Sequence, residues 1–155
     1  MKQQLQYDSP LGPLSLISRE DCLVALRFGA CAPMGDSPVL HAAKSWLDSY
    51  FSGQAPPFEL NLAPQGSAFQ QLVWQHCRRI PYGQTLTYGQ LAQMMACPGA
   101  ARAVGSALGC NPLLIMIPCH RVLPAAGGVG QYAAGSAIKQ ALLEWEMIDK
   151  STLRV

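Results

Sequence analysis

The chain has 155 residues, of which 50% are hydrophobic and 13% charged, and its formal net charge at pH 7 is +2. A chain of this length and composition can bury a real apolar core in one or two small domains. No apolar run approaches the roughly 20 residues of a membrane span, and the first residues lack the apolar centre of a signal peptide. We therefore expect a soluble cytoplasmic protein with no membrane partner.

The six cysteines form no C-x-x-C pair. This pattern argues against a zinc knuckle and against a thioredoxin-type redox centre. In a cytoplasmic protein the cysteines are expected to remain thiols. We expect no metal site and no cofactor.

The first 65 residues are expected to form a small α/β domain. Alternating apolar residues on both sides of a turn at residues 19–21 predict an antiparallel hairpin, namely Leu14, Leu16, Val24, Leu26 and Phe28. Ser37 and Pro38 are typical of a helix start, and Gly53 of a helix end. Phe58, Leu60 and Leu62 alternate again and predict a further strand. Pro64 and Gly66 mark the predicted boundary between domains 1–65 and 66–155.

The second domain opens with helices. A capping box at Ser67 begins a helix, with Phe69, Leu72, Val73 and His76 expected on one side. A second capping box at Thr87 begins a short helix. The turn residues 97–99 interrupt the chain before another helix at 100–108, so the order is that of a helix-turn-helix.

Charge divides unevenly between the two domains. Residues 1–65 hold four basic and six acidic side chains, for a net −2, whereas residues 66–155 hold seven basic and three acidic, for a net +4. No acidic residue lies between Glu59 and Glu144. The second domain is thus the expected side for a polyanion, although five positive charges over that span could also be an ordinary solvated face.

Residues 115–122 contain a candidate reactive cysteine site. The apolar run 115–117 predicts a buried strand that ends at Pro118, which cannot donate to a strand ladder. Cys119 and His120 follow directly. A thiol acts as a nucleophile in its thiolate form, and a nearby base can supply that form. The alternative is a buried structural cysteine beside a packed histidine.

The run PCHRVL at 118–123 resembles the active-site motif of the O6-alkylguanine-DNA alkyltransferases. The similarity continues, in the family's order, through residues 80–83, 101–105, 111–112 and 130–132. It implies a small ribonuclease H-like first domain and a mainly helical, winged-helix-like second domain containing the helix-turn-helix. It also implies a monomer that binds double-stranded DNA containing O6-alkylguanine and transfers the alkyl group irreversibly to Cys119.

The resemblance also assigns roles to further residues. His120 is the base that acts on Cys119 through a water, with Glu146 behind it, in the logic of a catalytic triad. Glu146 ends a predicted amphipathic helix with the apolar stripe Ala134, Ala137, Ile138, Ala141, Leu142 and Trp145. Glu144 would serve as well on chemistry alone, and Glu146 is preferred for its register with the family.

The DNA-binding roles follow from the same resemblance. Arg102 matches the finger that enters the base stack in the minor groove, Tyr88 helps to rotate the nucleotide, and Asn111 ties the helix-turn-helix to the active-site segment. The expected pocket residues are Val122 through its backbone, Tyr132 and Ala133, and Arg121 is expected to pair with a carboxylate in the scaffold.

Two departures from the family leave the accepted alkyl groups open. Ala133 replaces a serine found in some relatives, and Leu114 replaces a proline. Two other functions also remain possible. One is a module that binds the lesion without transfer, which the presence of Cys119 argues against, and the other is a Cys-His thiol hydrolase.

Overall fold

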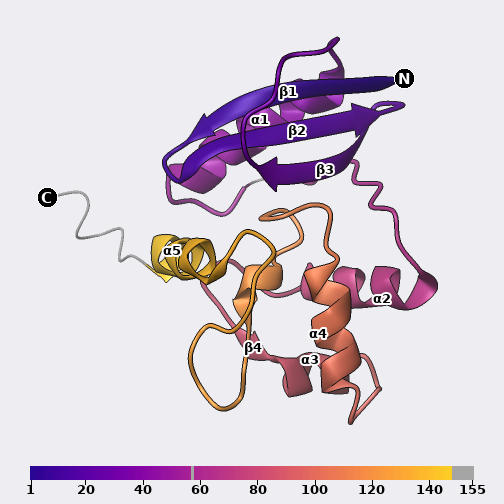
Figure 1. The fold of residues 1–155 in the computed structure, drawn as a ribbon, viewed down its shortest axis with the longest axis vertical. Helices are drawn as coiled ribbons and strands as arrows, with labels where there is room; N and C mark the ends of the chain where they lie inside the picture. Colours follow the sequence, from indigo (N-terminus) through magenta and orange to yellow (C-terminus); the bar gives the residue numbers. More distant parts are fainter. Residues whose placement is uncertain (57, 148–155) are drawn as a thin grey trace, which may run out of the picture.

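A computed structural model describes residues 1–56 and 58–147 of the chain. Residues 148–155, the last part of the predicted second domain, lie outside the described residues. The first unit begins with an antiparallel sheet in the order β1-β2-β3, formed by β1 (Lys2–Ser9), β2 (Gly12–Arg19) and β3 (Cys22–Phe28) (Figure 1). The β2-β3 hairpin and its turn were predicted, whereas β1 was not.

The turn between β2 and β3 uses two residues with positive φ, Glu20 at 50° and Asp21 at 57°. Such a turn matches the twist of the flanking strands. The pairing sets Leu14 opposite Phe28 and Leu16 opposite Leu26, with an irregularity in the register between Ile17 and Ser18. This irregularity leaves Val24 only half-buried while Leu23 is fully buried. The predicted strict alternation is therefore wrong at Val24, because a bulge adds one residue to the strand.

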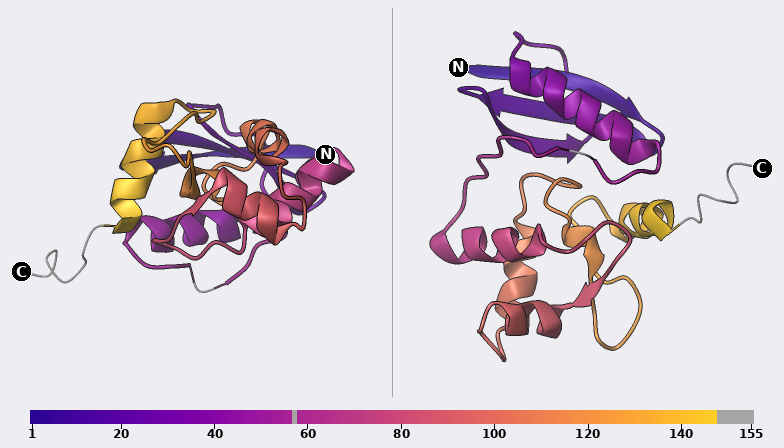
Figure 2. Two further views of the ribbon diagram at one scale, coloured as in Figure 1. Left: turned by 90° about the horizontal axis from the view of Figure 1, so that it is seen from below. Right: turned by 180° about the vertical axis from the view of Figure 1, so that it is seen from behind.

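Helix α1 (Pro38–Phe51) covers one face of this sheet, as the rear view in Figure 2 shows. Ser37 caps it as predicted, because its hydroxyl accepts a hydrogen bond from the Leu40 amide. The buried residues of α1 are Val39, Leu40, Ala43, Leu47 and Tyr50. This spacing puts one apolar stripe against the strands.

The strand predicted at Phe58, Leu60 and Leu62 is wrong. Among the described residues of this segment, pairing is limited to one isolated parallel bridge between Leu62 and Leu23. Alternation in sequence produces a strand only where a partner edge continues alongside, and here the chain leaves β3 after a single bridge.

The second unit begins with α2 (Ala68–Cys77), followed by α3 (Tyr88–Met94) and α4 (Ala101–Gly109). Both predicted capping boxes, at Ser67 and Thr87, are formed on both sides. The face predicted for α2 is wrong in part. Val73 is buried and Phe69 packs against the core as expected, but Leu72 is exposed, and Trp74 and Cys77 are buried as well. The Trp74 indole donates to the Ala107 carbonyl at 2.9 Å, which fixes α2 against α4.

The segment between α4 and Cys119 joins the two units through their backbones. The Leu26 amide of β3 donates to the Pro112 carbonyl at 2.9 Å, and the Leu114 amide donates back to Leu26 at 3.3 Å. Residues 113–117 are all buried, and they include the run 115–117 for which burial was predicted. They are not a strand, however, because Ile115 has a φ of 72° and the Met116 amide donates to the Leu114 carbonyl. Such a tight turn is strained for a β-branched residue.

The 3₁₀ turn η1 (Cys119–Arg121) follows, and β5 (Val122–Leu123) pairs in parallel with β4 (Leu86–Thr87). The last described helix is α5 (Ser136–Met147), whose buried residues are Lys139, Leu142, Leu143 and Glu146. The predicted apolar stripe is wrong in part, since Ala137 is exposed and Lys139 is buried in its place.

The fold class is nonetheless confirmed, with a mixed first unit and a mainly helical second one.

Within residues 1–56 and 58–147, no helix has the length and apolar character needed to cross a membrane.

Candidate active site

The turn η1 brings Cys119, His120 and Arg121 into the interior, where each is at most 7% exposed. The Cys119 amide donates to the Ile117 carbonyl at 2.7 Å and the Arg121 amide to the Pro118 carbonyl at 2.9 Å. These bonds close the backbone tightly around Pro118. Because these residues form a 3₁₀ turn and not an extended strand, neighbouring side chains do not point to opposite faces.

Asn111 binds three groups around the thiol. Its Nδ2 donates to the Ile117 carbonyl at 2.8 Å and lies 3.2 Å from Cys119 Sγ, and its Oδ1 accepts from the Leu113 amide at 2.9 Å. Asn111 comes next after Cys110, the residue that caps the end of α4. One side chain thus links the end of this helix with the turn that carries the cysteine.

Glu146 lies at the centre of a buried hydrogen-bond network. Its Oε2 is 2.5 Å from His120 Nε2, and its carboxylate forms an ion pair with Arg121, at 2.7 Å from Nε to Oε1 and 3.1 Å from Nη2 to Oε2. The Gly83 amide also donates to Oε1, at 3.1 Å. The alternative, Glu144, is exposed and accepts a hydrogen bond from Gln140 on its own helix.

The ionisation of these groups follows from burial and contacts. Burial would raise the pKa of Glu146, but the hydrogen bond from His120 and the hydrogen bonds and charge of Arg121 outweigh it and hold this pKa well below its usual range. Burial lowers the pKa of His120 despite the opposing effect of Glu146. The imidazole is therefore neutral at pH 7 and donates from Nε2 to the carboxylate. Its Nδ1 has no hydrogen-bond partner among the described residues and is left as an acceptor.

The thiol itself is protonated at rest. Burial raises the pKa of Cys119 to about 11, although the Asn111 hydrogen bond and the Lys139 charge act in the opposite direction. At pH 7 only about one molecule in 10⁴ would carry a free thiolate. Reaction at Sγ thus requires a base that removes the proton as the bond forms.

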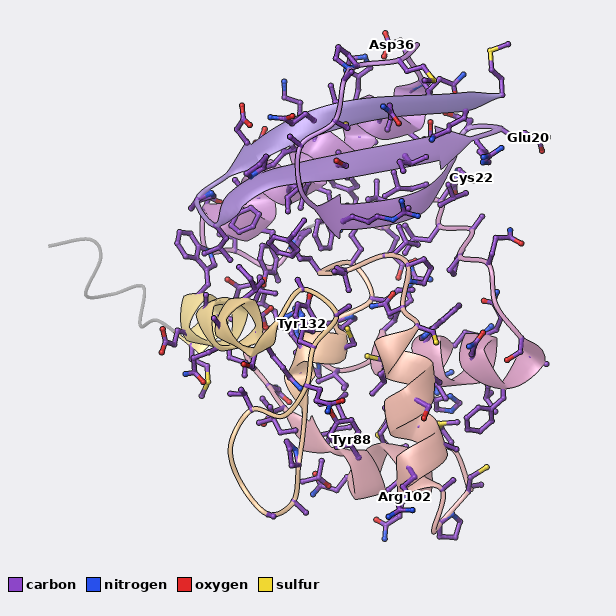
Figure 3. The ribbon with its side chains drawn as sticks, in the orientation of Figure 1. Glu20, Cys22, Asp36, Tyr88, Arg102 and Tyr132 are labelled. Carbon is purple, nitrogen blue, oxygen red and sulfur yellow. The ribbon has the colours of Figure 1, made fainter. Side chains whose placement is uncertain are left out.

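A cavity of about 810 Å³ opens onto Cys119. Its walls include Tyr88, Arg102, Tyr132 and Ala133 together with the small residues of α4. Figure 3 shows Arg102 at the end of α4 remote from the three-stranded sheet, and Tyr88 nearer to Tyr132. The cavity is large enough to hold a small aromatic ligand.

Two other residues predicted to shape the pocket, Val122 and Leu114, do not line the cavity. The Val122 side chain is fully buried, and its carbonyl oxygen accepts from Lys139 Nζ at 2.8 Å. A carbonyl oxygen has two lone pairs, but Val122 is not among the residues that line the cavity. Leu114 is buried and bonded through its backbone to β3, and it is not among the residues that line the cavity.

Sequence reasoning missed two polar residues of this region. Lys139 is fully buried, and its Nζ also donates to the Gln131 carbonyl at 3.2 Å and approaches the Tyr88 hydroxyl at 3.5 Å. The helix spacing could have identified it, because Lys139 lies seven residues before Glu146 and shares its face. The other is Tyr50, whose hydroxyl donates to Glu146 Oε2 at 2.5 Å. No local pattern indicates a contact between residues 96 positions apart.

No group of three or more His, Cys, Asp or Glu side chains in the described part of the chain could hold a metal ion.

The fold and the site together define a two-part protein in which a buried thiol, next to a histidine-carboxylate pair, faces a cavity walled by a short helix of small residues. Two family models match the chain, the ribonuclease-like domain of 6-O-methylguanine DNA methyltransferase at residues 5–64 and its DNA-binding domain at residues 68–148. The chain belongs to this family of methylated-DNA–protein-cysteine methyltransferases.

Individual relatives agree with this assignment. The methylated-DNA–protein-cysteine methyltransferase of Mycobacterium tuberculosis is 41% identical over 146 residues, covering 90% of this chain and 88% of that protein. The enzyme of the same name from Methanosarcina acetivorans is 38% identical, with coverages of 90% and 95%. The crystal structure of M. tuberculosis OGT in complex with DNA matches with a TM-score of 0.83 and 41% identity, covering 92% of this chain and 91% of that one.

Proposed function

We propose that this protein repairs O6-alkylguanine in double-stranded DNA by transferring the alkyl group to Cys119 in a single turnover. The observation that carries the proposal is the position of Cys119, buried at a cavity next to a neutral His120 whose Nδ1 is free to accept a proton. A guanine inside a duplex cannot reach such a thiol. The damaged nucleotide must therefore be flipped into the cavity.

The chemical step begins with the thiol proton. His120 Nδ1 accepts this proton from Cys119 Sγ through a bridging water, and the Glu146 carboxylate stabilises the imidazolium that results. Sγ then attacks the alkyl carbon on guanine O6. A carbon-sulfur bond forms while the carbon-oxygen bond breaks, and the electron pair leaves with the guanine, which takes up the proton that His120 had accepted. The thioether that remains on Cys119 ends the cycle, since nothing in the proposal removes it.

The DNA side of the proposal rests on α3 and α4. Arg102 is exposed on α4, and the neighbouring Ala101, Gly105, Ser106 and Gly109 line the cavity. Such small side chains allow a helix to lie deep in a minor groove without reading base edges. We assign Arg102 to the gap left by the flipped nucleotide and Tyr88 to its rotation. Tyr132 and Ala133 form the wall beside the base, and the Val122 carbonyl accepts from its exocyclic amine.

The protein is expected to act as a monomer, because one chain supplies every proposed site residue. We place it in the cytoplasm. All six cysteines are free thiols, and a reactive thiol is maintained in a reducing compartment.

The decisive experiment is the intact mass of the protein after incubation with a duplex containing one O6-methylguanine. We expect a gain of about one methylene that maps to Cys119, and no gain in Cys119→Ser, because the thiolate is the nucleophile. Tight lesion binding without a mass gain would indicate a non-catalytic lesion sensor. If the protein neither bound the lesion nor gained mass, but turned over small acyl esters, it would be a thiol hydrolase.

A further inference from the structure

The first unit contributes one side chain to the buried network around Glu146. Tyr50 lies near the end of α1, is fully buried, and donates from its hydroxyl to Glu146 Oε2 at 2.5 Å. The sequence indicates only that this tyrosine is part of the apolar face of α1. Its hydroxyl nevertheless reaches the same carboxylate oxygen that contacts His120 Nε2.

The Glu146 carboxylate receives five hydrogen bonds. Tyr50, His120 and Arg121 Nη2 donate to Oε2, while Arg121 Nε and the Gly83 amide donate to Oε1. A carboxylate offers about four lone-pair sites. Tyr50 and His120 therefore share the negative charge of one crowded oxygen.

We propose that Tyr50 is a positioning residue for the reaction centre, which fixes the Glu146 carboxylate against His120 and sets the basicity of the imidazole. The inference rests on the proposed function, since it assigns a purpose to the His120 base. With the phenol in place, Oε2 attracts the imidazolium proton less strongly, and His120 stays neutral at rest with Nδ1 ready to accept. The first unit thus acts on the chemistry as well as supporting the fold.

The phenol remains a donor at every working pH. Burial, and then the charge of Glu146, raise the pKa of Tyr50 far above its ordinary value. The other titratable or charged groups that face Tyr50 or His120 are Tyr82, Arg121 and Lys139, together with Tyr132, whose ring meets the imidazole edge-on, and Cys119, the neighbour of His120 in the turn η1. Each of these side chains is retained in Tyr50→Phe.

The ring of Tyr50 is held independently of its hydroxyl. Trp46 stacks on it with ring centroids 5.8 Å apart, and Phe51 and Tyr82 meet it edge-on at 5.0 and 5.6 Å. Tyr50→Phe should therefore keep the packing and remove one hydrogen bond. Tyr7→Phe is a matched control, because the buried Tyr7 hydroxyl donates to Asp48, on the same helix, at 2.7 Å.

The test measures the pKa of His120 by NMR of the imidazole nitrogens in the full chain without substrate. The chain has three histidines, so His41→Gln and His76→Gln assign the signals. We expect Tyr50→Phe to raise the pKa of His120 by about one unit, which is a tenfold gain in proton affinity. Tyr7→Phe should leave it unchanged.

A kinetic experiment completes the test. The rate of Cys119 alkylation by free O6-benzylguanine should fall on the acid side as His120 protonates, and in Tyr50→Phe this fall should move to higher pH by the same amount. A profile and a His120 pKa that both match the wild type would overturn the inference, even if the variant were less stable. The proposed function is tested separately: it fails if the wild type forms no thioether. The two tests are independent, because the NMR measurement of the His120 pKa needs no substrate.

Discussion

The substitution Glu146→Gln tests the centre of the proposed relay. An amide keeps one acceptor oxygen but places an NH₂ group where Oε2 now meets the donors of Tyr50, His120 and Arg121. The buried Arg121 guanidinium would also lose its counter-charge. Removing one partner of a buried ion pair costs about 3–5 kcal/mol, so we expect a decrease of this size in the free energy of unfolding.

The same substitution should impair the base. The new NH₂ group would donate to His120 Nε2, so the imidazole proton would move to Nδ1, the atom that must accept the proton of Cys119. Loss of a general base lowers a rate by about 10²–10⁴-fold, and we expect at least about 10²-fold here. The apparent pKa of Cys119 alkylation should also rise, since the thiolate would lose its imidazolium partner.

The assay is single-turnover transfer of a labelled methyl group from O6-methylguanine in a duplex, with urea unfolding of the same samples. Glu144→Gln is the control, because Glu144 lies on the same helix and is exposed. It should change the free energy of unfolding by less than about 0.5 kcal/mol. A folded Glu146→Gln variant that transferred methyl within about threefold of the wild-type rate would refute the relay.

Two further predictions concern the DNA contact and the thiol. Arg102→Ala should slow repair of a duplex by about 30- to 100-fold but leave reaction with free O6-benzylguanine within about threefold, because a free base needs no flipping. Equal losses on both substrates would refute the finger role, and Arg79→Ala, an exposed arginine just past α2, is the control. Burial raises the pKa of Cys119 from 9.0 to about 11, so the folded chain holds the proton that the unfolded chain releases. The associated stability is complete below pH 9 and lost as the pH rises through 11. The stability of the wild type relative to Cys119→Ser should therefore fall by about 2–3 kcal/mol over this interval, and parallel urea-unfolding curves for the two proteins would contradict the raised pKa.

The protonated resting thiol has a consequence for selectivity. A cysteine with a low pKa would react with any soft electrophile in the cell. Cys119 is 5% exposed and carries a raised pKa. It should react efficiently only with a ligand that enters the cavity and lies in line with Sγ, while His120 removes the proton. Burial thus suppresses side reactions and makes the neighbouring base necessary.

The amino-acid sequence by itself determined the local features of this protein. Both capping boxes, at Ser67 and Thr87, form as predicted, and so do the β2-β3 hairpin and the cap of α1 at Ser37. These features depend on bonds between residues a few positions apart, so the residue types alone specify them. The motif around Cys119 likewise identified the family, because its residues are adjacent in the chain.

The tertiary structure alone decided what depends on distant contacts. The apolar run before Pro118 is buried as predicted, but the bridge to β3 is made by Leu113, and the positive φ of Ile115 then turns the chain where a strand was expected. The inward face of α5 includes Lys139, because carbonyl groups from two other segments satisfy its charge. Tyr50 reaches Glu146 only because the first unit packs against the second. Long-range hydrogen bonds, which no local pattern encodes, placed Tyr50 and Arg121 against the carboxylate of Glu146.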